Sequence, residues 1–89
     1  MEIEYDPPKD EETRRGRGLP FELAKDLLQN FVVEFEDDRR DYGERRMIAF
    51  GEIAGRLHVC VYTMRGEVYR IISLRRANEK EVRQWQPNE

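Results

Sequence analysis

The stretch RRMIAFGEIAGRLHVCVYTMRGEVYRIISL, residues 45–74, contains three runs rich in β-branched and aromatic side chains, a composition typical of strands. Short turns at residues 54–55 and 64–66 separate the runs. Strands joined by such short turns pair antiparallel, so we predict a meander with strands at 46–52, 56–63 and 67–74. The middle run alternates, and we expect two sets of side chains to lie on opposite faces: Leu57, Val59 and Val61 on one, and His58, Cys60 and Tyr62 on the other.

Helical signals precede the meander. After an alternating run at 2–5 that predicts a short strand, Asp6 can act as an N-cap and two prolines suit a first helical turn. We predict a helix from Pro7 to about Arg15, ended by Gly16 and Gly18. A second helix is predicted at 20–30, because apolar residues recur there at helical spacing. Its apolar face is expected to comprise Phe21, Ala24, Leu27, Leu28 and Phe31.

The remaining segments complete an α+β pattern. The segment FVVEFED, residues 31–37, is predicted to form a strand. The charged segment that follows it, which contains Gly43, is predicted to be a loop. Asp37 and Asp38, where strand and loop meet, are interpreted as solvated. Asn78 can cap a C-terminal helix, and Glu81 completes a capping box. The order predicts one domain over residues 1–89, an antiparallel meander with the helices packed on one of its faces.

The composition excludes several classes of protein. The 89 residues carry a net charge of −3, with 39% charged and 38% hydrophobic residues, so the chain is neither fully disordered nor strongly basic. The single cysteine, Cys60, allows no internal disulfide and fits a reducing cytoplasm. No apolar run reaches the length of a membrane helix, and the acidic N-terminal segment lacks the features of a secretory signal. We therefore expect a cytoplasmic protein.

Candidate chemistry is concentrated in arginine. One histidine and one cysteine cannot form a Cys/His zinc site, and the glycines form no nucleotide-binding loop, so no metal or cofactor is expected. Arg70, Arg75 and Arg76 gather at the last strand of a chain that is otherwise acidic. Guanidinium groups bind phosphate in a two-pronged geometry, which suggests an anionic target. The alternative interpretation is that these arginines pair with acids such as Glu79 and Glu81, and the sequence leaves both open.

Several motifs in this order resemble the BrnT family, the toxins of BrnT–BrnA type II toxin–antitoxin systems, whose fold is related to the RelE-like ribonucleases. The resemblance runs from about Ile3 to Trp85. It is carried by EYDPPK at residues 4–9, GLPFELA at 18–24, GERRMIAFG at 43–51 and above all YRIISLRRANEKEVRQW at 69–85. One departure concerns chemistry: the family usually has Lys-His-Gly where this chain has Gly16-Arg17-Gly18. An arginine cannot shuttle protons, although it can hold a phosphate.

The resemblance implies a metal-independent endoribonuclease in which the ribose 2′-hydroxyl attacks the adjacent phosphate, and a BrnA-like antitoxin partner in a hetero-oligomer. By match to the motifs, the implied catalytic residues are Lys9, Glu44, Arg45, Arg70, Ser73 and Arg75. Arg70 and Arg75 are assigned to the phosphate, and Glu44 or Lys9 to proton transfer. Further RNA contacts are assigned to Arg17, Arg46, Arg76 and Trp85. The alternative is a catalytically inactive binding module that acts only as the antitoxin's partner or as a co-repressor.

Overall fold

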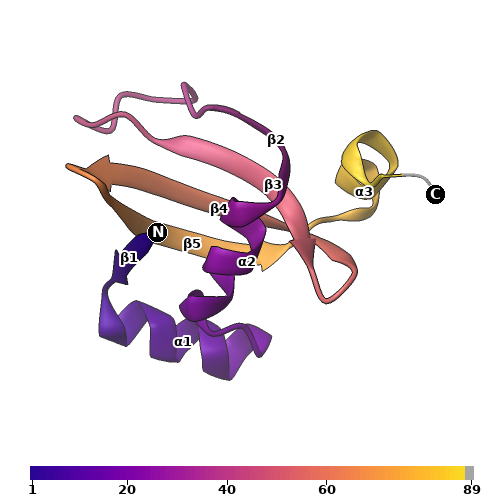
Figure 1. The fold of residues 1–89 in the computed structure, drawn as a ribbon, viewed down its shortest axis with the longest axis horizontal. Coiled ribbons are helices and arrows are strands. Elements are labelled where there is room, and N and C mark those ends of the chain that lie inside the picture. Colours follow the sequence, from indigo (N-terminus) through magenta and orange to yellow (C-terminus); the bar gives the residue numbers. More distant parts are fainter. Residues whose placement is uncertain (88–89) are drawn as a thin grey trace.

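The computed structural model describes residues 1–87, which form a five-stranded sheet with the strand order β1-β5-β4-β3-β2 (Figure 1). In chain order the elements are β1 (Glu2–Tyr5), α1 (Pro7–Arg17), the 3-10 helix η1 (Phe21–Leu23), α2 (Ala24–Gln29), β2 (Phe31–Glu36), β3 (Met47–Ile53), β4 (Arg56–Arg65), β5 (Val68–Arg76) and α3 (Glu79–Trp85). Within residues 1–87, none of the helices is long and apolar enough to span a membrane.

The sheet is mixed, which corrects the expectation of a purely antiparallel meander. Strands β2 to β5 pair antiparallel as predicted, but β1 pairs parallel to β5, with Ile3 opposite Tyr69 and Tyr5 opposite Ile71. Strand β4 is also longer than predicted, because Met64 and Arg65 still belong to it and the turn begins only at Gly66. The α+β class is confirmed.

The main core lies between α2 and one face of the sheet. Phe21, Ala24 and Leu28 contribute to it as predicted, and the sheet supplies Ala49, Ile53, Cys60, Tyr62, Ile71 and Leu74. The helix comes so close to β3 that a Cβ on Gly51 would lie 2.9 Å from the carbonyl oxygen of Leu27. Phe31 was assigned to this helix wrongly: the helix ends at Gln29, and Phe31 begins β2 with 46% of its surface exposed.

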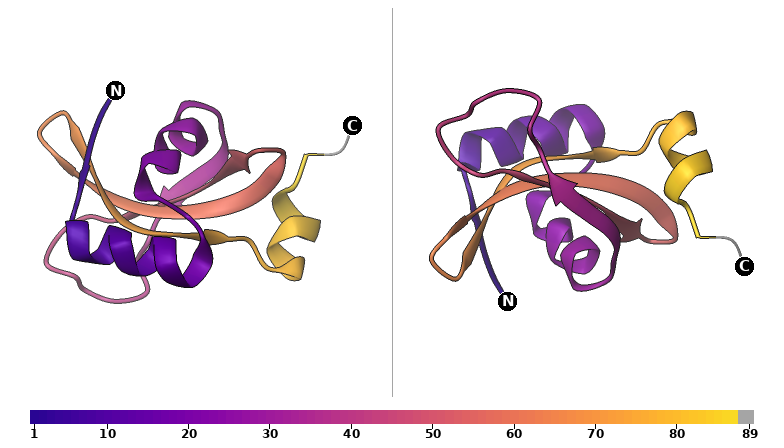
Figure 2. Two further views of the ribbon diagram at one scale, coloured as in Figure 1. Left: turned by 90° about the horizontal axis from the view of Figure 1, so that it is seen from below. Right: turned by 90° about the horizontal axis from the view of Figure 1, so that it is seen from above.

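Helix α1 lies beside β5 (Figure 2). It continues through Gly16 to Arg17 and ends where Gly18 adopts a left-handed φ of 68°, so Gly16 does not end it as expected. The side chain of Asp6 makes no capping hydrogen bond, which also corrects the prediction. The buried Asp10 instead ties α1 to η1: its Oδ1 accepts a hydrogen bond of 2.7 Å from the Phe21 N–H, and its Oδ2 pairs with Arg14.

The opposite face of the sheet carries a smaller core, built on Phe50, Leu57 and Val59. Trp85 from α3 packs there, with its ring centroid 6.1 Å from that of Phe50. The helices therefore do not all lie on one face, contrary to expectation. The predicted capping box at the start of α3 is present, since Asn78 and Glu81 exchange hydrogen bonds between side chain and backbone.

Candidate functional site

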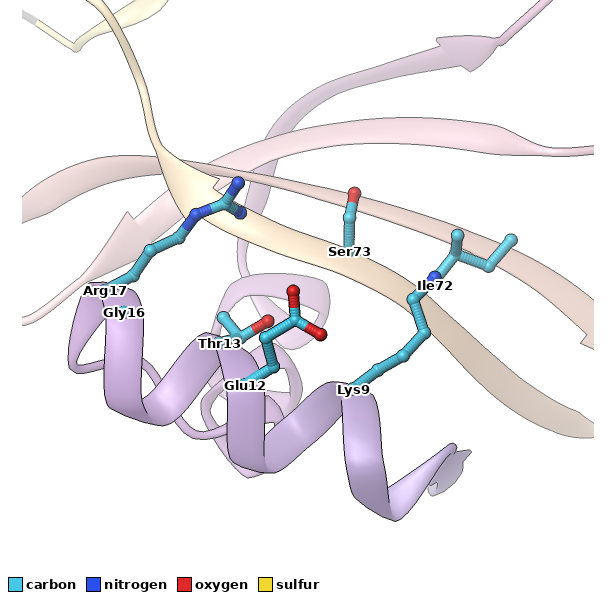
Figure 3. Close-up of a pocket in the computed structure, with 7 residues that line it drawn as sticks. All are labelled: Lys9, Glu12, Thr13, Gly16, Arg17, Ile72 and Ser73. Carbon is cyan, nitrogen blue, oxygen red and sulfur yellow. The ribbon is translucent and has the colours of Figure 1, made fainter.

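Two adjoining hollows lie between α1, β5 and the end of the loop before β3. The first encloses about 370 Å³ and is lined by Lys9, Glu12, Thr13, Gly16, Arg17, Ile72 and Ser73 (Figure 3). The second encloses about 160 Å³, and its charged lining consists of Asp6, Lys9, Glu44, Arg46, Arg65 and Arg70. Lys9 and Ile72 line both hollows, so the two form one continuous site.

The fold brings this site together through the parallel pairing of β1 with β5. Because Tyr5 pairs with Ile71, the chain leaves the sheet next to the middle of β5 and turns directly into α1. The first turns of α1 therefore place Lys9 beside Ile72. The pairing of β4 with β5 also shifts register between the pairs Tyr62–Ile71 and Val61–Ser73, which leaves Ile72 as an extra residue. Such a bulge re-aims side chains, and here Ile72 lines both hollows.

Positive charge exceeds negative charge around the site. Lys9, Arg17, Arg46, Arg65 and Arg70 line the two hollows, against the acids Asp6, Glu12 and Glu44. Two of the cations are already engaged by carboxylates, since Arg70 donates a 2.7 Å hydrogen bond to Glu4 and Arg46 donates one of 3.0 Å to Glu44. These pairs hold the guanidinium groups in place on the partly exposed face.

Two further cations complete the first hollow. Arg17 donates a 2.9 Å hydrogen bond from Nη1 to the carbonyl oxygen of Leu74, which fixes its side chain against β5. The ammonium group of Lys9 forms no ion pair with any residue between 1 and 87. Figure 3 shows the side chains of Lys9 and Arg17 extending from α1 toward β5 at the two ends of the first hollow.

A buried carboxylate organises the loop that carries Glu44 and Arg46. Asp37 is only 4% exposed, and it accepts hydrogen bonds of 2.7 Å from both Nε and Nη2 of Arg39 and one of 2.9 Å from the Tyr42 hydroxyl. The hydrogen bonds from Arg39 hold the pKa of Asp37 well below its usual range. The interpretation of Asp37 as solvated is therefore wrong, while Asp38 is exposed as expected.

Asp37 and Tyr42 also contact Arg46, which lines the second hollow. The Asp37 N–H donates a 2.8 Å hydrogen bond to the carbonyl oxygen of Arg46, and the Arg46 guanidinium lies 4.2 Å from the centroid of the Tyr42 ring. Sequence reasoning missed Asp37, Arg39 and Tyr42 as members of the site's support, and also missed Arg65 in its lining. The one signal in the sequence was Tyr42, an aromatic residue among charged residues in a loop, and this pattern does not identify which side chains it will contact.

Six of the ten predicted site residues line the two hollows: Lys9, Arg17, Glu44, Arg46, Arg70 and Ser73. The other four lie elsewhere. Arg75 makes two hydrogen bonds of 2.9 Å to the carboxylate of Glu81, and this contact lowers the pKa of Glu81. Arg45 pairs with Glu36 at 3.3 Å, and Arg76 lines a separate hollow beside α3. The ring of Trp85 packs on Phe50.

The single histidine and cysteine do not line the two hollows. His58 is 3% exposed, and its Nδ1 lies 2.7 Å from the carbonyl oxygen of Arg56. Cys60 is fully buried, and burial raises the pKa of its thiol to about 12. In the part of the chain that the structure describes, no group of three or more His, Cys, Asp or Glu side chains is arranged to hold a metal ion.

Arginine and lysine side chains around a hollow suit the binding of a phosphodiester, because several cations there can share the charge of the phosphate oxygens. A comparison with family models agrees with this chemistry. The model described as "Ribonuclease toxin, BrnT, of type II toxin-antitoxin system" matches residues 5–81, a range that includes all the residues that line the two hollows. No curated protein gives a significant match. The chain therefore belongs to the BrnT family of ribonuclease toxins of type II toxin–antitoxin systems.

Proposed function

We propose that this chain is an endoribonuclease in which the 2′-hydroxyl of a ribose attacks the adjacent phosphate within the two adjoining hollows. The observation that carries the proposal is the position of Lys9, which lines both hollows, with Arg17 in the first and Arg46 and Arg70 in the second. A phosphate bound next to Lys9 would meet positive charge on both sides. Membership of the BrnT family supplies the reaction class.

In the proposed reaction, Arg70 and Arg46 bind the non-bridging oxygens of the phosphate and stabilise the negative charge of the transition state. Glu44 accepts the proton of the 2′-hydroxyl as the new O–P bond forms, after RNA has drawn Arg46 from its carboxylate. Lys9 donates a proton to the 5′-oxygen as the P–O bond breaks. The products are a 2′,3′-cyclic phosphate and a free 5′-hydroxyl, and the cationic side chains serve in place of a metal ion.

The other assigned residues take supporting roles in the proposal. Arg17 and the hydroxyl of Ser73 contact the RNA backbone along the first hollow, where both residues line the wall. Arg45, whose side chain is 73% exposed, is available to a longer RNA strand. Arg75 is reassigned from phosphate binding to holding α3, because both of its Nη groups already donate hydrogen bonds to the carboxylate of Glu81.

The biological setting follows from the family. Type II toxins are neutralised by a protein antitoxin, and we propose a BrnA-like antitoxin that forms a hetero-oligomer with this single-domain chain in the cytoplasm. The mixed α+β sheet with flanking helices is compatible with the RelE-like relationship that the sequence resemblance implies.

The decisive experiment measures cleavage of a defined RNA by purified wild type, Lys9→Ala, Arg70→Ala and Arg83→Ala. Lys9→Ala and Arg70→Ala should each lose roughly 10²–10³-fold in rate, the usual effect of removing a proton donor or a group that stabilises the charge of the transition state. Arg83→Ala is the matched control, because it also removes one cation, but from an exposed position on α3 (72% exposed). A 2′-deoxy substitution at the cleaved nucleotide should abolish cleavage, whereas a chelator should have no effect.

Melting temperatures of the same proteins separate chemistry from folding. The assignment of the site fails if Lys9→Ala and Arg70→Ala cleave RNA as fast as Arg83→Ala. One observation favours the second candidate function, an inactive partner of the antitoxin: Arg17 stands at the end of α1, where the family usually has a histidine. A folded wild-type protein that cleaves no RNA and does not arrest growth would establish that alternative.

A further inference from the structure

A row of side chains crosses the face of the sheet that α2 does not cover. Cross-strand pairing places Phe35 beside Ile48, Ile48 beside Val61 and Val61 beside Ser73. We call these four residues the open-face row. Phe35, at the outer edge, is 42% exposed, and the other three are half-buried. The row therefore offers a mainly apolar surface that ends at Ser73, in the wall of the first hollow.

The two faces of the same strands are covered very differently. On the α2 side, Ala49, Cys60 and Leu74 have no exposed surface. On the open face, α3 contributes Trp85 at one end, where its ring lies 6.5 Å from that of Phe35. The contacts within residues 1–87 thus leave the row accessible between Trp85 and the hollows. Half-buried aliphatic side chains on a sheet face favour coverage by another apolar surface.

The chemistry of the row discriminates between protein and RNA as its occupant. Ile48 and Val61 have no hydrogen-bonding groups and no aromatic face, whereas RNA is usually bound by stacking and by cations. A protein segment can bury such aliphatic side chains. At its inner end the row meets the cationic hollows, which attract carboxylates. An occupant that is apolar along its length and acidic at one end complements both features.

We propose that the antitoxin docks across the open-face row. Its apolar side chains cover Phe35, Ile48 and Val61, and its carboxylates enter the hollows beside Lys9, Arg46 and Arg70. The proposal rests on the proposed function, because it makes neutralisation a direct exclusion of RNA from the catalytic hollows. It predicts that antitoxin and RNA compete, and that antitoxin binding weakens as ionic strength rises.

The test compares Phe35→Asp with Val32→Asp, in binding of the purified BrnA-like antitoxin and in cleavage of RNA. The two positions lie three residues apart on β2 with matched exposure, 42% and 41%, but Val32 lies outside the row. Phe35→Asp should bind the antitoxin at least about tenfold more weakly, as for loss of an interface anchor. It should cleave RNA like the wild type, and Val32→Asp should match the wild type in both assays.

Three results would overturn the proposal. The first is equal antitoxin affinity of the two variants. The second is loss of RNA cleavage in folded Phe35→Asp with antitoxin binding intact, which would make the row an RNA surface. The third is a wild-type homodimer that Phe35→Asp dissociates while antitoxin binding is unchanged. If the wild type cleaves no RNA, the proposed function fails, and the binding comparison still decides whether the antitoxin uses the row.

A labelling experiment covers the case in which Phe35→Asp does not fold. Phe35→Cys and Val32→Cys each add one accessible thiol, and the buried Cys60 does not compete for the reagent. The antitoxin should protect Phe35→Cys from a maleimide and leave Val32→Cys reactive. Equal labelling of Phe35→Cys with and without bound antitoxin would refute the docking surface.

Discussion

Replacing Asp37 with Asn tests how the loop before β3 holds Arg46 at the site. The carboxylate accepts two side-chain hydrogen bonds of 2.7 Å from Arg39 and one of 2.9 Å from Tyr42. An asparagine side chain keeps the shape of the aspartate, but it has no charge and only one acceptor oxygen in place of two. Because Asp37 is buried whereas 70% of the Arg39 side chain is exposed, solvent screens part of the loss. We expect a destabilisation of about 1–3 kcal/mol, the cost of leaving buried hydrogen-bonding groups without their partner.

Thermal unfolding provides the assay, and Asp38→Asn is the matched control. Asp38 is the next residue, carries the same charge and is exposed. For a domain of this size, the expected loss lowers Tm by roughly 4–24 °C, while the control should stay within about 0.5 kcal/mol of wild type. Measured below its own Tm, Asp37→Asn should also cleave RNA roughly tenfold more slowly, because small displacements of catalytic groups are costly. Equal melting of the two variants would refute this account of the loop.

The same carboxylate predicts a dependence of stability on pH. In the folded chain the pKa of Asp37 lies below that of the unfolded chain, about 3.9, because Arg39 stabilises the charged form. The contribution is therefore complete above pH 5 and is lost as the pH falls through 4 and below, down to the folded pKa. The free energy of unfolding of Asp37→Asn should therefore fall less steeply below pH 5 than that of Asp38→Asn.

Three other substitutions test separate features. Gly16→Ala lies inside α1, with no heavy atom within 4 Å of the new Cβ, and should raise stability by up to about 1 kcal/mol. It should also slow RNA cleavage, because the methyl group narrows the first hollow. Unchanged cleavage would show that RNA does not approach α1 there. Arg75→Ala should lower stability by about 0–1 kcal/mol through loss of the partly exposed Glu81 pair and leave cleavage per folded molecule unchanged. A large loss of cleavage rate would return Arg75 to the proposed catalytic residues. Native Cys60 should resist thiol reagents, and Cys60→Ser should retain cleavage; rapid labelling would contradict its burial.

Local patterns predicted the elements well where one periodicity dominated. The alternation in β4 separates Val59 from Cys60 by face, and the structure places them in the two different cores. The capping box of Asn78 and Glu81 was also predicted, because it needs only residues three apart. Phe31 was misassigned because its spacing from Leu27 and Leu28 fits a helix equally well, and only the pairing of β2 with β3 decides its state.

Long-range contacts account for what the sequence left open. Nothing near Glu4 indicates that it will pair with Arg70, 66 residues later, or that β1 will run parallel to β5. Arg70 and Arg75 looked equivalent in one motif. The structure separates them because Arg75 meets Glu81 at the start of α3 whereas Arg70 faces the second hollow. The pairing with Glu81 was one of the two interpretations that the sequence allowed.

The parallel pairing of β1 with β5 also sets the order of events during synthesis. β1 leaves the ribosome before β5, and within residues 1–87 its one partner strand is β5, so residues 2–5 must wait for residues 68–71 before they can join the sheet. Lys9 and Arg70 consequently meet only after β5 has been translated. A nascent or prematurely terminated chain that lacks β5 cannot form the proposed phosphate site, so the ribosome that makes this chain is not exposed to that site until β5 has been translated.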